Sequence, residues 1–239
     1  MRTIAIIPAR SGSKGLVNKN IKMLAGKPMI AYTIEACIAS GCFDVVHVST
    51  DSEEYGRIAK HYGAEVPFLR EENLASDSAT TESVIKFVLQ KYREMEGGNR
   101  EFSHFAIMQP TSPLRTAEDI REAFALLKEK QADSVIGICQ MEHSPLWSNT
   151  LPDSHSMEGF LNQTNNRERH EFDTYYRING AMYLVKTDIY TDHMAMYGPR
   201  SFGYIMNKSH SVDVDDAFDF RFAEVLLATE EINKCEKTR

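Results

Sequence analysis

The 239-residue sequence has few cysteines, one tryptophan and no long apolar run. Its four cysteines, Cys37, Cys42, Cys139 and Cys235, show no Cys-x-x-Cys or Cys/His spacing, so neither a disulfide framework nor a zinc site is expected. No stretch approaches the roughly 20 apolar residues of a membrane span, and no secretory signal precedes Ile4. We therefore expect a cytoplasmic protein that has no membrane partner.

Positive charge is also scarce, because 27 lysines and arginines face 34 aspartates and glutamates, for a net charge of −7. Phosphate backbones reward clustered cations, so a nucleic-acid partner is not expected. Hydrophobic residues make up 42% of the chain and charged residues 26%, as in an ordinary globular protein. The length suits one α/β domain with an insertion. A small anionic ligand on a locally basic loop is compatible with this composition.

Apolar strand patterns alternate with amphipathic helix patterns along most of the chain, which predicts a largely parallel sheet with helices on both faces. Strands are expected at 4–7, 45–48, 105–108, 134–139, 181–185 and 204–206. Helices are expected at 28–40, 55–62, 81–92, 117–127 and from 218 onward, the last with one face formed by Phe218, Phe222, Val225 and Leu226. The alternation fails over 141–177, where the sequence is polar. We therefore divide the chain into a core, 1–140 and 178–239, and an insert, 141–177.

A loop with glycines and cations follows the first apolar strand. Its sequence is Ala9-Arg10-Ser11-Gly12-Ser13-Lys14-Gly15, and Lys19 and Asn20 come shortly after it. A strand that ends in such a loop presents backbone N–H groups and positive charge to a polyphosphate. The glycine spacing fits neither the Walker A motif nor the dinucleotide fingerprint, so those two kinds of site are not expected. We predict that Arg10, Lys14 and Lys19 hold phosphate groups; the alternative is a glycine turn with solvated cations.

Two aspartates near the C-terminus lie in the second motif, Ser211-Val212-Asp213-Val214-Asp215-Asp216. Residues two apart in an extended segment point to the same side, so Asp213 and Asp215 can present their carboxylates together. Two carboxylates and the oxygens of a phosphate suit Mg²⁺, which prefers oxygen ligands and keeps several waters. The alternative is that Asp215 or Asp216 only caps the last helix and that Asp213 is a solvated surface charge.

Three further polar segments lie where a ligand could bind. The segment 70–81 enters a helix and offers hydroxyls, backbone groups and one arginine, which could read a base and a ribose. The segment 109–115 follows the carboxyl end of a strand, where open α/β sheets bind ligands. The segment 176–183 places an arginine, an amide and a glycine before a strand, and a guanidinium suits a carboxylate or a phosphate. Each segment also fits an ordinary loop or turn.

Together these motifs resemble those of the N-acylneuraminate (sialic acid type) cytidylyltransferases, in matching order along nearly the whole chain. The resemblance implies a Rossmann-like nucleotidyltransferase fold with a mostly parallel sheet and a small projecting dimerisation element, 141–177. It implies that CMP passes from CTP to a nonulosonic sugar acid with release of pyrophosphate. It also implies Mg²⁺, with Mn²⁺ as a substitute, on Asp213 and Asp215, and a homodimer in which Arg169 reaches the neighbouring active site.

The resemblance further assigns roles to single residues. Nucleotide contacts fall on Ala9, Arg10, Asn20, Arg70, Ala79 and Thr81, and sugar-acid contacts fall on Gln109, Arg169, Arg177, Asn179, Met196 and Tyr197. Trp147 stands where the family often has a lysine, which leaves the sugar open between neuraminic, legionaminic, pseudaminic and Kdo-type acids. A metal-dependent glycosyltransferase and a non-catalytic nucleotide-binding module are the alternatives from other functional classes.

Overall fold

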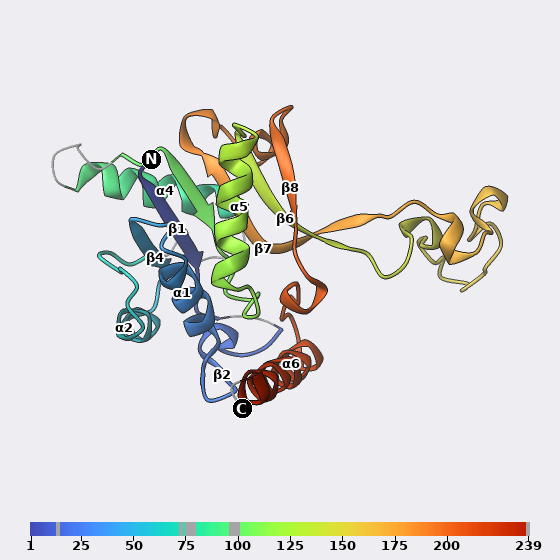
Figure 1. Cartoon of the computed structure of the whole chain (residues 1–239), viewed down its shortest axis with the longest axis horizontal. Coiled ribbons are helices and arrows are strands. Elements are labelled where there is room, and N and C mark those ends of the chain that lie inside the picture. The colour runs from blue at the N-terminus through green and yellow to red at the C-terminus, as the bar shows by residue number, and fades with distance from the viewer. Residues whose placement is uncertain (13–14, 72–73, 75–79, 96–100, 238–239) are drawn as a thin grey trace.

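A six-stranded sheet in the order β4-β1-β5-β7-β6-β8 forms the centre of the protein in a computed structural model, which describes residues 1–12, 15–71, 74, 80–95 and 101–237 (Figure 1). The strands are β1 (Thr3–Pro8), β4 (Val45–Ser49), β5 (His104–Ile107), β6 (Ser134–Gln140), β7 (Tyr176–Lys186) and β8 (Ser201–Ile205). Strand β7 runs antiparallel to β5 and β6, and the other five strands run in one direction. The predicted mostly parallel α/β sheet is confirmed.

Helices cover both faces of this sheet, as predicted. They are α1 (Met29–Ser40), α2 (Glu53–His61), α4 (Thr81–Glu94), α5 (Ala117–Glu129) and α6 (Ala217–Lys237). Helices α1, α2 and α5 share one core with Ala5 and Ile7, whereas α4 packs on the other face with Ile4 and Ile6. Successive residues of a strand point to opposite faces, so the unbroken apolar run of β1 serves both cores. None of the helices in these described ranges is both long and apolar enough to cross a bilayer.

Local signals place the helix ends where the sequence predicts them. The hydroxyl of Thr80 accepts a hydrogen bond from Ser83 N and caps α4. Thr116 and Asp119 form a capping box at the start of α5. Gly41 ends α1 with a φ of 66°, a conformation that glycine adopts without strain. Capping chemistry is therefore a reliable guide to element boundaries in this chain.

Helix α6 packs through a different face from the one that its most hydrophobic stripe indicates. Phe218, Phe222 and Val225 do lie at helical spacing, but they are exposed. Phe220 and Ala223 are buried instead, in a third cluster that includes Leu24 and Leu114 of the loops beside the sheet and Leu226 at its margin. The helix carries two apolar stripes, and contact with the short hairpin of β2 (Met23–Leu24) and β3 (Lys27–Pro28) selects the second.

Strand β7 is longer than the predicted 181–185, because its first residues pair with β6 beyond the part of β7 that pairs with β5. Gln140 pairs with Tyr176 and Ile138 with Ile178, after a register shift between Ile136 and Ile138. The intervening residues contain only short 3₁₀ helices, at Pro145–Trp147, Gln163–Asn165 and Arg169–Glu171. We call residues 141–177 the arm; it projects far from the core (Figure 1).

Candidate active site

Polar segments gather at the edge of the sheet where the parallel strands end. Strand β1 leads into 9–12, β4 into 50–51 and β5 into 109–115, and the antiparallel β7 passes the same edge at 179–180. The segment 211–215 returns to this edge, because Val214 N donates a 2.8 Å hydrogen bond to Thr111 O. Open α/β sheets bind their ligands at this edge.

The first loop is closed at its base by Asn20, whose side-chain amide donates a 3.3 Å hydrogen bond to Arg10 O. Ala9 is buried and its N–H donates to Ser49 O of β4. Ala9, Arg10 and Asn20, three of the nucleotide contacts that the resemblance implies, therefore lie together at the mouth of the loop. Lys14 lies outside the described residues.

The loop and the C-terminal aspartates lie in contact although they are about 200 residues apart in sequence. A Cβ added to Gly15 would lie 2.9 Å from the carbonyl oxygen of Asp215. Lys19 Nζ lies 3.0 Å from Asp215 Oδ1; the lysine side chain is 13% exposed and the aspartate side chain 75%. The side chain of Lys19 is therefore mostly buried, and its ammonium group lies at the rim of the site next to the solvent-exposed carboxylate of Asp215.

The carboxylate of Asp213 has the surroundings of a group that binds a cation. It is half-buried, and among the described residues its Oδ1 atom has no hydrogen-bond partner. Burial raises its pKa, a hydrogen bond from the Thr111 side chain opposes this shift, and the neighbouring Asp215 adds to it. A buried carboxylate oxygen without a partner is costly, and a divalent cation removes that cost.

Asp213 and Asp215 therefore fit Mg²⁺, with waters and ligand oxygens as its further ligands. The described part of the chain contains no group of three or more histidine, cysteine, aspartate or glutamate residues placed to hold a metal without such help. Gly180, with a φ of 74°, would place a Cβ 3.5 Å from Asp213 Oδ2. The β7 backbone thus passes close to this carboxylate.

Arg70 fixes the loop that follows β4. It is 8% exposed, and its guanidinium donates to Ser49 O at 2.8 Å, to Ser49 Oγ at 3.3 Å and to Leu74 O at 3.4 Å. Burial lowers its pKa to about 10, a shift that Asp51 opposes and Arg10 increases. Arg70 and Arg10 are therefore electrostatic neighbours at the same mouth. Thr81 is exposed in the first turn of α4, and Ala79 lies outside the described residues.

These features coincide with membership of a known family. The family described as cytidylyltransferase matches residues 4–238. The chain belongs to the cytidylyltransferase family. It is 40% identical to the N-acylneuraminate cytidylyltransferase of Escherichia coli O18:K1:H7 over 93% of this chain and 52% of that protein. The chain thus spans about half the length of the first curated relatives it matches.

Two further comparisons cover whole proteins. The chain is 33% identical to the CMP-N,N'-diacetyllegionaminic acid synthase of Legionella pneumophila, over 95% of this chain and 97% of that one. A solved CMP-2-keto-3-deoxy-manno-octonic acid synthetase in complex with CTP covers 96% of this chain and is itself covered completely, with a TM-score of 0.69 and 14% identity. That structure shows the shared nucleotidyltransferase fold of the family.

In this cytidylyltransferase family member, the predicted sugar contacts fall in different environments. Gln109 is partly buried directly after β5, and its carbonyl accepts a hydrogen bond from Thr33 Oγ1 at 3.4 Å. Asn179 is 1% exposed, and its amide donates to Ser211 Oγ and Met206 Sδ at 3.0 Å each. The structure thus places Asn179 as a link between β7 and the aspartate segment, with its amide directed into the protein.

Met196 and Tyr197 of the family member are adjacent in sequence but differ in burial. Met196 is fully buried in the core shared with α4, whereas Tyr197 is 38% exposed. Burial, then the nearby Tyr197 and Asp213, raise the pKa of Tyr183. Tyr183 is therefore near both Tyr197 and Asp213, and Tyr197 is the member of the predicted pair with access to a ligand.

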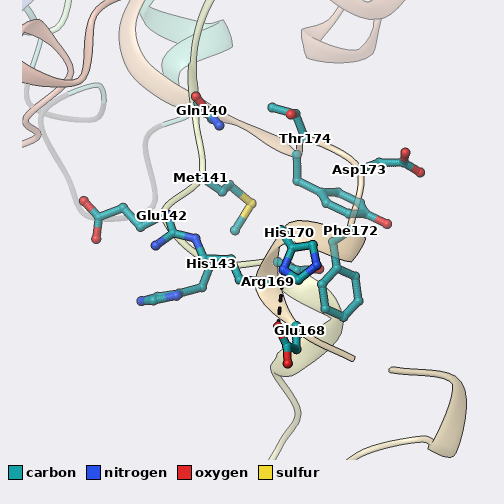
Figure 2. A pocket seen from close by; sticks show the side chains of 12 residues that line it. Gln140, Met141, Glu142, His143, Glu168, Arg169, His170, Phe172, Asp173 and Thr174 are labelled. Carbon is teal, nitrogen blue, oxygen red and sulfur yellow. Dashed lines mark ion pairs between the residues drawn. The ribbon is translucent and has the colours of Figure 1, made fainter. Parts of the chain in front are cut away.

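The arm of the family member carries Arg169 away from the rest of the site. Arg169 is exposed and lines a cavity of about 520 Å³ together with His143, His170 and Tyr175, and Glu168 forms a 3.4 Å ion pair with His170 (Figure 2). The arm extends outward from the core (Figure 1), and the residues that line this cavity with Arg169 come from 140–144 and 168–175, not from the segment 211–215. Arg177 lies at the root of the arm and donates to Ser211 O at 3.4 Å.

Trp147 forms the interior of the arm rather than a sugar contact. Its indole N–H donates to Asn165 O at 3.0 Å, and its ring packs edge-on against Phe172 with centroids 5.2 Å apart. Arg167 lies over the other ring, 4.8 Å from the Phe172 centroid. A tryptophan in place of a lysine therefore gives the arm of this cytidylyltransferase family member a small aromatic core of its own.

Sequence reasoning did not single out three residues that the structure places at the site of this family member, Asp51, Thr111 and Tyr183, although the last two lie in segments that it marked. Asp51 follows β4 and its carboxylate accepts from Ser11, and Thr111 donates to Asp213. The position of Asp51 directly after a parallel strand is the same signal that identified Gln109, and it would have found Asp51 as well.

Proposed function

We propose that the protein transfers CMP from CTP to a nonulosonic, sialic-acid-like sugar acid and releases pyrophosphate. The observation that carries the proposal is the contact of the basic first loop, through Gly15 and Lys19, with Asp215 of the Asp213–Asp215 pair. A nucleotidyl transfer needs cations at the leaving pyrophosphate and a metal at the reacting phosphate in one place. The similarity to cytidylyltransferases that are named for N-acylneuraminate and legionaminic acid supports the substrate class.

In this proposal the anomeric hydroxyl of the sugar acid attacks the α-phosphorus in line, its proton passes to Asp213 or to a hydroxide, and the bond to the bridging oxygen of pyrophosphate breaks. Arg10, Lys14 and Lys19 balance the charge on the triphosphate and on the departing pyrophosphate. Mg²⁺ or Mn²⁺ on Asp213 and Asp215, when bound, neutralises charge on the reacting phosphate. Positioning and electrostatics supply most of the acceleration in such transfers, so no protein nucleophile is needed.

The loop after Arg70 is proposed to read cytosine. Each nitrogen of the Arg70 guanidinium donates a hydrogen bond to Ser49 or Leu74, so its part is to fix the loop while backbone groups and Thr81 meet the base and ribose. UTP differs from CTP at the edge of the base that such a site reads. Polar groups that lose their partner discriminate strongly, so CTP should be used at least ~100-fold better than UTP.

The test is a pyrophosphate-release screen of CTP, UTP, ATP and GTP against N-acetylneuraminic, legionaminic, pseudaminic and Kdo acceptors. We expect release only with CTP and a nine-carbon acid. N,N'-diacetyllegionaminic acid is the second candidate acceptor, because the relative named for its CMP ester matches this chain over both full lengths. Release with UTP at a similar rate refutes cytosine reading. Consumption of a CMP-sugar without pyrophosphate release identifies a glycosyltransferase instead.

We further propose a homodimer in which Arg169 serves the active site of the partner. The arm projects away from its own core, and apolar side chains at its root, Tyr176, Ile178 and Ile205, are exposed (Figure 1). Mixing Arg169→Ala and Asp213→Asn proteins tests this, since a mixed dimer has one site with both residues intact. Subunit exchange should restore about a quarter of the wild-type sites. No gain on mixing, or a fully active monomer in sedimentation, refutes the shared site.

The proposed location is the cytoplasm. Cys37, Cys42 and Cys139 are free thiols in the structure, as expected for a protein in a reducing compartment. Burial raises the pKa of Cys37 to about 12, so this thiol is an unreactive part of the core. Unchanged activity and thermal stability in the presence and absence of a reductant such as dithiothreitol would agree with this location.

A further inference from the structure

Two aspartates that flank β4, Asp44 and Asp51, each hold one end of its neighbour β1. At the edge opposite the site, Asp44 Oδ2 accepts a hydrogen bond from Thr3 N at 2.7 Å, while the Thr3 hydroxyl, 3.3 Å from the same oxygen, donates to Cys42 O at 2.6 Å. At the site edge, Asp51 accepts from Ser11 N at 2.8 Å through Oδ1 and from the Ser11 hydroxyl through Oδ2. Each carboxylate thus accepts the backbone N–H of a residue at one end of β1, and Asp51 also accepts the hydroxyl of that residue.

The two contacts differ in what they hold. Thr3 is the first residue of β1 and is already fixed by the sheet, through its pairing with His104 of β5. Ser11 lies beyond the last residue of β1, between Arg10 and Gly12, where the strand pairing has ended. Gly12 adopts a φ of 75°, so the chain turns immediately after Ser11. Asp51 is therefore the group that fixes the direction in which the loop leaves the strand.

We propose that Asp51 is a positioning residue for nucleotide binding, which orients the loop of Arg10 and Ser11 so that its N–H groups and cation face the triphosphate. The proposal rests on the proposed function. A carboxylate that accepts a backbone N–H and a hydroxyl makes strong, directional hydrogen bonds. A loop that is already ordered before the nucleotide arrives does not spend binding free energy on ordering.

The charges around Asp51 agree with this role. The carboxylate lies near Arg70, whose guanidinium is also repelled by the charge of Arg10. Burial alone would raise the pKa of Asp51, but the hydrogen bonds from Ser11 and the charge of Arg70 lower it below its ordinary value. An ionised Asp51 therefore offsets the repulsion that Arg10 exerts on Arg70.

The experiment compares Asp51→Ala with the matched control Asp44→Ala, each in the full chain. Two quantities are measured: hydrogen exchange of the Ser11 and Thr3 amides by NMR without nucleotide, and KM for CTP and for the sugar acid by pyrophosphate release. Asp51→Ala should speed Ser11 exchange about tenfold and raise KM for CTP about tenfold, with KM for the sugar acid within about twofold of wild type. Asp44→Ala should speed only Thr3 exchange.

Asp51→Asn distinguishes loss of the hydrogen bonds to Ser11 from a general loss of stability. An asparagine can accept from Ser11 N and donate to the Ser11 hydroxyl. It should restore most of the CTP affinity that Asp51→Ala loses. Equal effects of Asp51→Ala and Asp44→Ala on KM for CTP, unchanged Ser11 exchange, or an asparagine variant as weak as alanine overturns the proposal. If the wild-type protein turns over no CTP, the proposed function fails, and the exchange of the Ser11 amide still decides whether Asp51 orders the loop.

Discussion

Gly15 lets the first loop pass directly against the backbone of Asp215, and replacing it with alanine tests that close approach. The added Cβ would lie 2.9 Å from the carbonyl oxygen of Asp215, whereas ordinary contacts begin at 3.4 Å. The loop and the aspartate segment must therefore separate by about half an ångström. Misplacement by about 1 Å costs roughly 100-fold in rate, so half of that corresponds to about tenfold, or ~1.4 kcal/mol.

We expect Gly15→Ala to lower kcat/KM for CTP about tenfold in a pyrophosphate-release assay. Gly15 is exposed, so the free energy of unfolding should change by less than ~0.5 kcal/mol. Gly56→Ala is the control, because its added Cβ meets Val66 at 3.5 Å and Leu69 at 3.9 Å, both ordinary distances, in a helix away from the site. A Gly15→Ala protein with the kcat/KM of wild type would show that the loop does not depend on this contact.

Three other predictions concern the metal, the pH dependence of stability and a helix glycine. Asp213→Asn should lower turnover at least ~100-fold with an unchanged melting temperature, and EDTA should abolish wild-type activity until Mg²⁺ or Mn²⁺ is added. Asp119→Ala should lower the free energy of unfolding in urea by ~1–3 kcal/mol at pH 7. Burial alone would raise the pKa of Asp119, but hydrogen bonds from His210 and Thr116 lower it. The stabilisation by Asp119 is therefore present above about pH 4 and is lost as the pH falls through the folded-state pKa. The difference in free energy of unfolding between Asp119→Ala and wild type should shrink over that fall in pH. Gly56→Ala should raise the free energy of unfolding by ~0.5–1 kcal/mol, and an unchanged or lower value would show that its side chain does not fit.

The core of the fold could be predicted because its signals are local. Apolar runs mark the strands, and caps such as Thr116 with Asp119 mark helix starts. The extension of β7 could not, since Asn179 and Gly180 interrupt the apolar pattern and only pairing with β6 carries the strand onward. The packed face of α6 depends likewise on a tertiary contact, which favours Phe220 over the more hydrophobic stripe that begins at Phe218.

For the site, too, local sequence predicts some features and tertiary contacts decide the others. The pairing of Lys19 with Asp215 joins two motifs that the sequence marks separately, and composition identifies each of them. The burial of Asn179 depends on space beside Gly137, where a Cβ would lie 2.8 Å from the asparagine oxygen. That space comes from the register of β6 against β7, which no local pattern encodes. Residue type therefore predicts which segments form the site, and the register of the strands decides which of their side chains face the ligand.

The place of β7 in the sheet also constrains how the chain can fold. Strand β6 precedes β7 in sequence, but β7 lies between β5 and β6 in the sheet. The sheet is therefore complete only after the arm has been synthesised and β7 has paired with both neighbours. Strands β4, β1 and β5 can pair before that point, and β5 then keeps an open edge. Such edges template aggregation, and pairing of distant segments is slow. A fragment that ends at residue 140 would therefore expose this edge, which makes the irregular arm the connection on which completion of the sheet depends.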